Sequence, residues 1–165
     1  MKCIELLESI LKGKNNCIIS KKDAEGKNIS TIINKNPAYN DCRKDYNFIK
    51  IIPKEYVDFL SFSNGMELYN YDDIDGVRLL SLEEMEEYTL YAKNTFEDNW
   101  QDNILIFAKI IGEDSYLGFK LYEMKYEIVD CYFEVLPSEW SVIGENFDDF
   151  LQKYISKNGD KYWIN

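Results

Sequence analysis

Three apolar segments in a row, joined by very short connections, constrain the fold of this chain more than any other feature. Residues 104–111 are almost continuously apolar, whereas residues 115–121 and 126–135 alternate apolar and polar positions. A continuous apolar run is typical of a central strand covered on both faces, and alternation is typical of a strand with one buried face. The connections Gly112–Asp114 and Glu123–Lys125 have lengths that suit antiparallel hairpins. We therefore expect three neighbouring strands of a largely antiparallel sheet.

Helical signals flank this run of strands. Pro53 suits the start of a helix, and Asn64-Gly65 suits its end, with Gly65 in the left-handed position after the last turn. Ser81–Glu84 has the spacing of a capping box, which begins a second helix. Asn146 suits the N-cap of a third helix, whose apolar residues recur at helical spacing over 147–155. Strands in a run with helices before and after them predict an α+β fold, not an alternating βαβ sheet.

The first 45 residues are the part that these patterns describe least. Residues 12–45 are polar and rich in Asn and Lys, with short apolar runs at 17–19 and 29–33. Either short strands or a loosely ordered excursion fits them. A chain of 165 residues with 45% apolar content has the usual size of one domain and enough apolar side chains for a core. We expect one domain over residues 1–165, with residues 1–45 as an N-terminal elaboration.

The cysteines and the apolar runs indicate a reduced, non-membrane protein. Cys3, Cys17, Cys42 and Cys131 are scattered, form no CxxC pair, and have no histidine to join them in a zinc site. We interpret all four as reduced thiols. The N-terminus lacks the apolar run of a signal peptide, and no segment is long and apolar enough to span a bilayer. We therefore expect a cytoplasmic location.

The net charge of −11 is unevenly distributed along the chain. Residues 1–52 carry ten Lys and Arg against six Asp and Glu, a net +4, whereas residues 53–165 carry nine against twenty-four, a net −15. A negative field repels phosphate backbones, so we expect no nucleic-acid partner and no membrane. It attracts basic proteins and accelerates their encounter. Solubility alone is the simpler explanation of such an acidic composition.

Catalytic and cofactor patterns are weak in this sequence. If Asp73 and Asp75 are set at positions three and five of a calcium loop, Tyr71 and Leu82 fall where the first ligand and the bidentate glutamate are needed. Because the chain has no histidine, a Ser or Cys triad in its usual form is excluded. No phosphate-binding glycine motif occurs. A carboxylate-based enzyme remains open, but nothing marks its residues, so we expect no enzyme, no catalytic residues, no metal and no cofactor.

The order of these signals resembles the SUKH superfamily, which includes the Smi/Knr cell-wall-assembly regulators and many bacterial immunity proteins. The more specific segments are Pro53–Leu60, with the pattern Pro-x-x-Tyr-x-x-Phe-Leu, the following Asn64-Gly65, and Gly144–Leu151, with the pattern Gly-x-x-Phe-x-x-Phe-Leu. The resemblance covers about residues 50–155. It implies an α+β domain with helices against a largely antiparallel sheet and no catalytic residues. About fifty residues precede Pro53, more than the short leading helix of the family pattern.

Many bacterial members of this superfamily bind and neutralise a toxin, often a nuclease. The resemblance therefore implies an immunity protein that occludes a cognate toxin by steric block and by electrostatic mimicry of its substrate. We expect a basic toxin domain as the partner, and a monomer or weak dimer. The alternative is a regulatory scaffold of the cell-wall-regulator type, with no toxin. The candidate contact residues are the acidic stretches that we expect to be exposed, namely Asp72, Asp73, Asp75, Glu83, Glu86, Glu87, Glu97, Asp98, Asp102, Glu113 and Asp114.

Overall fold

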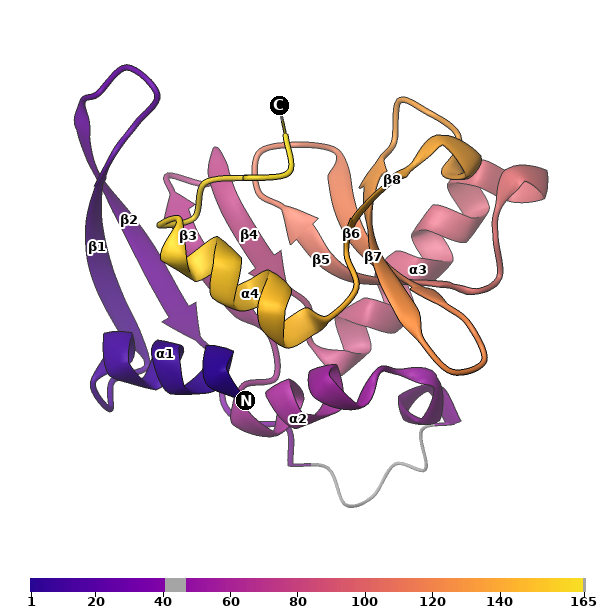
Figure 1. Cartoon of the computed structure of the whole chain (residues 1–165), viewed down its shortest axis with the longest axis horizontal. Helices are drawn as coiled ribbons and strands as arrows, with labels where there is room; N and C mark the ends of the chain where they lie inside the picture. Colours follow the sequence, from indigo (N-terminus) through magenta and orange to yellow (C-terminus); the bar gives the residue numbers. More distant parts are fainter. Residues whose placement is uncertain (41–46, 165) are drawn as a thin grey trace.

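An eight-stranded antiparallel sheet runs through the molecule, and its strands lie side by side in the order in which the chain makes them (Figure 1). The computed structural model describes residues 1–40 and 47–164. The predicted α+β class with a largely antiparallel sheet is confirmed. The strands are β1 (Asn16–Lys22), β2 (Asn28–Lys35), β3 (Met66–Tyr71), β4 (Asp75–Leu79), β5 (Ile104–Ile110), β6 (Ser115–Leu121), β7 (Tyr126–Tyr132) and β8 (Ser141–Gly144).

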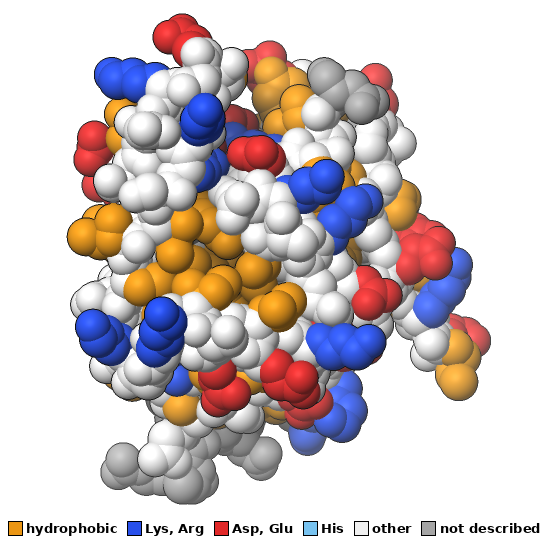
Figure 2. Space-filling view, turned by 60° about the vertical axis from the view of Figure 1, so that its left-hand side comes forward, with side chains coloured by type: hydrophobic (Ala, Val, Ile, Leu, Met, Phe, Trp, Pro, Cys, Tyr) orange, Lys and Arg blue, Asp and Glu red, His pale blue; other side chains and the backbone are white. Residues whose placement is uncertain are grey.

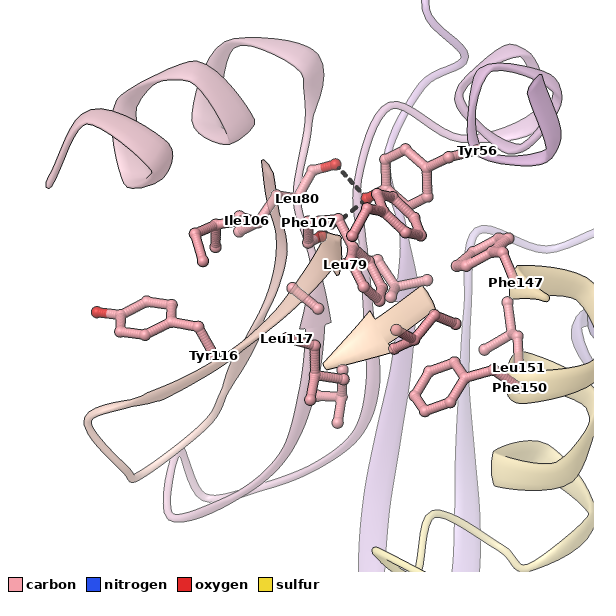
Figure 3. Close-up of a cluster of buried hydrophobic side chains, with 14 of the residues drawn as sticks. Tyr56, Leu79, Leu80, Ile106, Phe107, Tyr116, Leu117, Phe147, Phe150 and Leu151 are labelled. Carbon is pink, nitrogen blue, oxygen red and sulfur yellow. Dashed lines mark hydrogen bonds between the residues drawn. The ribbon is translucent and has the colours of Figure 1, made fainter. Parts of the chain in front are cut away.

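Helices cover both faces of this sheet. Helix α3 lies on one side of the central strands, and α4 lies on the other side (Figure 3), where α1 and α2 pack beside it (Figure 1). Within the described ranges, no helix is long and apolar enough to cross a membrane. The helices are α1 (Lys2–Leu11), α2 (Lys54–Phe62), α3 (Leu82–Phe96) and α4 (Phe147–Ser156), with 3₁₀ turns η1 (Asn47–Ile51), η2 (Glu97–Asn99) and η3 (Pro137–Glu139).

The core on the α4 side is built around the Tyr56 ring. This ring contacts Phe107, Phe119 and Phe147 with centroids 5.0–5.6 Å apart in edge-to-face arrangements. Its hydroxyl donates to the backbone carbonyl of Leu80 at 2.7 Å and lies 3.0 Å from that of Phe107 (Figure 3). Edge-to-face pairs add to the free energy gained by burying the rings. Every residue of β5 except the half-buried Lys109 is buried, which confirms the predicted central strand covered on both faces.

In the uncertain N-terminal region, residues 16–35 form a β-hairpin and not a loose excursion. Strands β1 and β2 pair in full register from Asn16 against Asn34 to Lys22 against Asn28. They continue the sheet at one edge, so the two short apolar runs are strands (Figure 1). Ile18 on the outer face of β1 remains 72% exposed. Alternation of half-covered and open positions along β1 explains why its sequence resembles a polar loop.

Three details of the predicted elements are wrong. The last predicted strand ends at Tyr132, not at residue 135, because Phe133 enters a turn in which its ring stacks on Trp140 at 6.1 Å. Strand β3 was not predicted. Helix α2 ends at an extended Ser63, so Gly65 does not cap it. Gly65 instead takes a φ of +87° where its backbone lies against Ser81 and Leu79, leaving little room for a Cβ.

The cysteines in the described part of the chain are free thiols. Cys3 and Cys131 are buried, and Cys17 is half-buried. Burial raises the pKa of the Cys131 thiol well above its ordinary value, so it stays protonated. Cys42 lies outside the described residues.

Candidate protein-binding surface

Two acidic turns lie against each other at one end of the sheet. The β3–β4 turn carries Asp72 and Asp73, and the β5–β6 turn carries Glu113 and Asp114. The turns pack closely because Gly112 has no side chain: a Cβ there would lie 2.3 Å from the carbonyl oxygen of Ile74. The sheet thus brings together four of the predicted contact residues from segments forty positions apart in the chain.

The conformation of the β3–β4 turn is fixed by its backbone angles and by hydrogen bonds with Asn70. Asp72 and Asp73 have φ values of 47° and 58°, a left-handed conformation that aspartate tolerates better than most residues. The Asn70 side chain accepts a hydrogen bond from the backbone N–H of Asp73 at 3.0 Å and donates to its carboxylate at 2.9 Å. Asp72 and Asp73 are both exposed. This turn therefore presents its carboxylates to solvent in a defined geometry.

Asp75 and Glu113, in contrast, are engaged within the chain. The Lys161 Nζ lies 3.3 Å from the Asp75 carboxylate and also pairs with Glu113, and the Lys21 Nζ lies 3.9 Å from Asp75 and 3.5 Å from Asp160. The two lysine side chains are only 7% and 15% exposed. These pairs tie the β1–β2 hairpin, the sheet and the C-terminal segment together. Sequence reasoning missed both lysines, because their partners are distant in the chain.

A cleft of about 490 Å³ opens beside these ion pairs. It lies between the hairpin and the C-terminal segment, and side chains of both charges line it, including Lys21, Lys161, Asp75 and Asp160. Figure 2 shows this side of the molecule, with hydrophobic side chains gathered in its middle and blue and red side chains around them. Because the charges in the cleft compensate each other, it adds little to the acidic surface.

The remaining predicted residues lie on and around α3, apart from the acidic turns. Glu83, Glu86 and Glu87 are on the first half of the helix and are exposed, and Glu97 and Asp98 form part of η2 beyond its end. Glu83 accepts a hydrogen bond from Asn64 at 3.3 Å. Asp102 pairs with Lys93 at 2.8 Å. The predicted acidic residues therefore come from two parts of the fold, the turns at the end of the sheet and α3 with the segment that follows it.

Aromatic side chains connect the acidic turns with α3. Tyr116 on β6 contacts Tyr88 and Tyr91 of α3, with ring centroids 5.5 and 6.4 Å apart. Burial raises the pKa of the Tyr116 hydroxyl, and the neighbouring Asp114 carboxylate, to which it hydrogen-bonds, raises it further. Tyr91 and Tyr132 are 46% and 44% exposed. Tyrosine is enriched among the residues that dominate binding energy in protein interfaces, and here it lies next to acidic groups.

No metal centre is found among the described residues. In residues 1–40 and 47–164, no group of three or more Cys, Asp or Glu side chains is placed to hold a metal ion. The acidic turns point their carboxylates outward or pair them with lysine.

The fold is that of an α+β protein, and one of its faces carries acidic and aromatic side chains. The chain belongs to the SMI1 / KNR4 family (SUKH-1), whose pattern it matches over residues 41–153. Members of this family bind proteins, and they are generally immunity or regulatory proteins without enzymatic activity.

Two proteins of Bacillus subtilis (strain 168) are similar to the chain. The uncharacterized protein YobM is 28% identical over 119 residues, which is 68% of this chain and 61% of YobM. The uncharacterized protein YnaB is 29% identical over 119 residues, which is 67% of this chain and 70% of YnaB. The chain thus spans about three fifths of the length of YobM. No solved structure matches it significantly.

Proposed function

We propose that this chain is an immunity protein, which binds a cognate toxin with a basic surface, such as a nuclease, and blocks it. The observation that carries the proposal is the pairing of the two acidic turns at one end of the sheet, next to the exposed tyrosines. Nuclease toxins need a basic cleft for phosphates, and an acidic protein surface can occupy such a cleft. Family membership supports a protein-binding role without catalysis.

Affinity capture tests the proposal directly. The immobilised chain is exposed to lysate and culture medium of its source, washed at low and then at high salt, and the retained proteins are identified. We expect one basic protein with a toxic activity that falls to zero at a one-to-one ratio with the chain. Retention of housekeeping proteins only, with no toxic activity among them, would instead support the regulatory scaffold.

Grouped substitutions locate the contact surface once a toxin is in hand. In the first variant, Asp72→Asn, Asp73→Asn and Asp114→Asn remove three carboxylates of the acidic turns, none of which forms an ion pair within the described ranges. We expect the association rate constant to fall about tenfold and to lose much of its salt dependence, because charge steering is lost. Surface plasmon resonance at several salt concentrations measures both.

Two further variants change the net charge by the same amount. Glu86→Gln, Glu97→Gln and Asp98→Asn test the α3 group of candidate residues. Glu5→Gln, Glu8→Gln and Glu25→Gln are the control, because these exposed residues on α1 and the hairpin are outside both groups. An equal loss in all three variants would show that net charge, not a defined surface, attracts the toxin.

A further inference from the structure

A second cavity, of about 310 Å³, lies beside the acidic turns. Its volume is at the small end of the range of about 300–1,000 Å³ for ligand pockets, so it suits a single side chain better than a cofactor. Residues from four separate segments line it: Glu113 and Ser115 near the β5–β6 turn, Asp130 and Tyr132 of β7, Val135, Glu139, Trp140 and Ser141 around η3, and Ile164 of the C-terminal segment.

The aromatic wall of this cavity is rigid. The Trp140 indole Nε1–H donates to the carbonyl oxygen of Tyr132 at 3.0 Å. Its ring stacks on Phe133 with centroids 6.1 Å apart and meets the edge of Phe96 at 5.3 Å. Trp140 is 8% exposed. A side chain that is already fixed loses no conformational entropy when a ligand packs on it, which favours binding.

The cavity also contains more negative than positive charge. Glu113, Asp130 and Glu139 line it, and Lys161 pairs with Glu113. Asp130 and Glu139 form no ion pair with any described residue. Burial raises the pKa of the Asp130 carboxyl, and the neighbouring Glu113 raises it further, although Ser115 and Lys161 act in the opposite direction. A cation placed here would offset both the cost of desolvating the Asp130 carboxylate and its repulsion by Glu113.

We propose that this cavity receives an arginine side chain of the partner protein. A guanidinium group is planar, stacks on aromatic rings and donates several hydrogen bonds to carboxylates at once, so it can lie on Trp140 and reach Asp130 and Glu139 together. A lysine ammonium group offers no planar surface and is more strongly hydrated. That the arginine comes from a protein rests on the proposed function; the preference of the cavity for a guanidinium group does not.

Titration with small capped amino acids tests this preference without any toxin. The ¹⁵N-labelled full chain is titrated with N-acetyl-arginine amide, N-acetyl-lysine amide and N-acetyl-citrulline amide, which is the uncharged isostere of arginine. We expect a saturable shift of the Trp140 indole N–H and of the Ser115 and Asp130 amides with the arginine compound. The citrulline compound should bind about tenfold more weakly, because it lacks the charge. The backbone amides of Glu8 and Gly13, at the end of α1 and outside the cavity lining, serve as internal controls.

Substitutions in the cavity provide the second arm. Asp130→Asn with Glu139→Gln should weaken arginine binding about tenfold, and the control pair Glu123→Gln with Glu145→Gln, away from the cavity, should leave it unchanged. Equal binding of arginine and citrulline compounds, or arginine shifts that leave Trp140 unmoved, would overturn the proposal. If the arginine compound binds as expected but no toxin is captured, only the immunity function fails; if a toxin is captured but arginine does not bind, only the cavity proposal fails.

The pH dependence of the same titration gives an independent readout. The groups that face Asp130 are Glu113 on the β5–β6 turn, Ser115 on β6, Glu139 on η3 and Lys161 on the C-terminal segment. Since the pKa of Asp130 is raised, this carboxyl takes up its proton at a higher pH than an ordinary aspartate. Arginine binding should therefore weaken as the pH is lowered from 7 toward that raised pKa. An affinity that rises or stays constant over this range would contradict the role of Asp130.

Discussion

At the scale of single residues, a few side chains join separate elements of the fold through hydrogen bonds to backbone groups. Tyr56 belongs to the Pro-x-x-Tyr segment, which the sequence marks only as a helix with an apolar face. The structure adds that its hydroxyl satisfies the Leu80 carbonyl just before α3 begins. Burial raises the pKa of Tyr56 well above its ordinary value, so it remains a neutral donor at physiological pH. One side chain thus fixes α2 to the junction of β4 and α3.

Replacing the buried tyrosines by phenylalanine separates packing from hydrogen bonding. Tyr56→Phe should lower the free energy of unfolding by about 1–3 kcal/mol, because it leaves a buried carbonyl without its donor. Tyr154→Phe is the matched control: its hydroxyl is buried and has no hydrogen-bond partner among the described residues, so its loss should cost less than about 0.5 kcal/mol. Urea denaturation measures both. A larger loss for Tyr154→Phe than for Tyr56→Phe would contradict this assignment.

Asp148 of α4 caps a different helix. Its carboxylate accepts hydrogen bonds from the backbone N–H groups of Cys3 at 2.8 Å and Lys2 at 3.2 Å, and α1 has no side-chain cap of its own. Asp148→Ala should therefore cost about 1–2 kcal/mol, the usual value of an N-cap. Asp149→Ala, in the same turn but exposed, should cost clearly less.

The contribution of Asp148 should depend on pH in a defined direction. Burial alone would raise the pKa of this carboxyl, but the hydrogen bonds from Cys3 and Lys2 outweigh it and lower the pKa below its ordinary value. A lowered folded-state pKa means that the stabilisation is complete above the unfolded pKa of about 3.9 and is lost as the pH falls through the folded value. The stability difference between wild type and Asp148→Ala should accordingly be constant from pH 7 to 5 and shrink below about pH 4. A difference that grows on acidification would contradict this linkage.

At the scale of elements, the sequence predicts best where a local signal and the final contact coincide. The capping box of α3 is confirmed, with Ser81 accepting from the Glu84 N–H. Asn64, interpreted as the end of α2, instead accepts a hydrogen bond from the Leu82 N–H at the start of α3. That role depends on a chain reversal through β3 and β4, which no local pattern contains. The pairing of the acidic turns and the lysines near them were unpredictable for the same reason.

The contact between the two acidic turns depends on Gly112. Both Gly112 and Gly26 have positive φ values, +81° and +80°, but a Cβ at Gly26 would meet nothing within 4 Å. Gly26→Ala should cost only the left-handed strain, about 1–2 kcal/mol, whereas Gly112→Ala should cost about 2–5 kcal/mol because it also forces the β3–β4 turn away. Thermal unfolding compares the two. Equal destabilisation would show that the turns adjust freely and that their pairing is not fixed.

At the scale of the whole molecule, the charge separation along the sequence becomes a separation in space. The net positive first 52 residues include α1 and the hairpin at one edge of the sheet, and most acidic residues belong to residues 53–165, which form the other strands with their turns and helices α2 to α4 (Figure 1). The exception is the contact at Asp75, where Lys21 of the hairpin and Lys161 of the C-terminal segment meet one carboxylate. This contact joins parts of the chain that are 140 residues apart.

Substitutions at Asp75 and Asp102 test whether the stabilisation from an ion pair depends more on the distance between its charged atoms or on the burial of its side chains. The Lys93–Asp102 pair is shorter, at 2.8 Å, but its side chains are 54% and 82% exposed. Solvent screens such a pair, so Asp102→Asn should change the free energy of unfolding by less than about 1 kcal/mol. Asp75→Asn leaves two largely buried lysines without their shared carboxylate and should cost about 1–3 kcal/mol, a value reduced from that of fully buried pairs because Asp75 itself is 37% exposed. Hydrogen exchange should then increase in β1, β2 and residues 159–164 together, since the same carboxylate holds both segments. If only one of these segments exchanged faster, the two lysines would be acting separately, and Asp75 would not join the ends of the molecule.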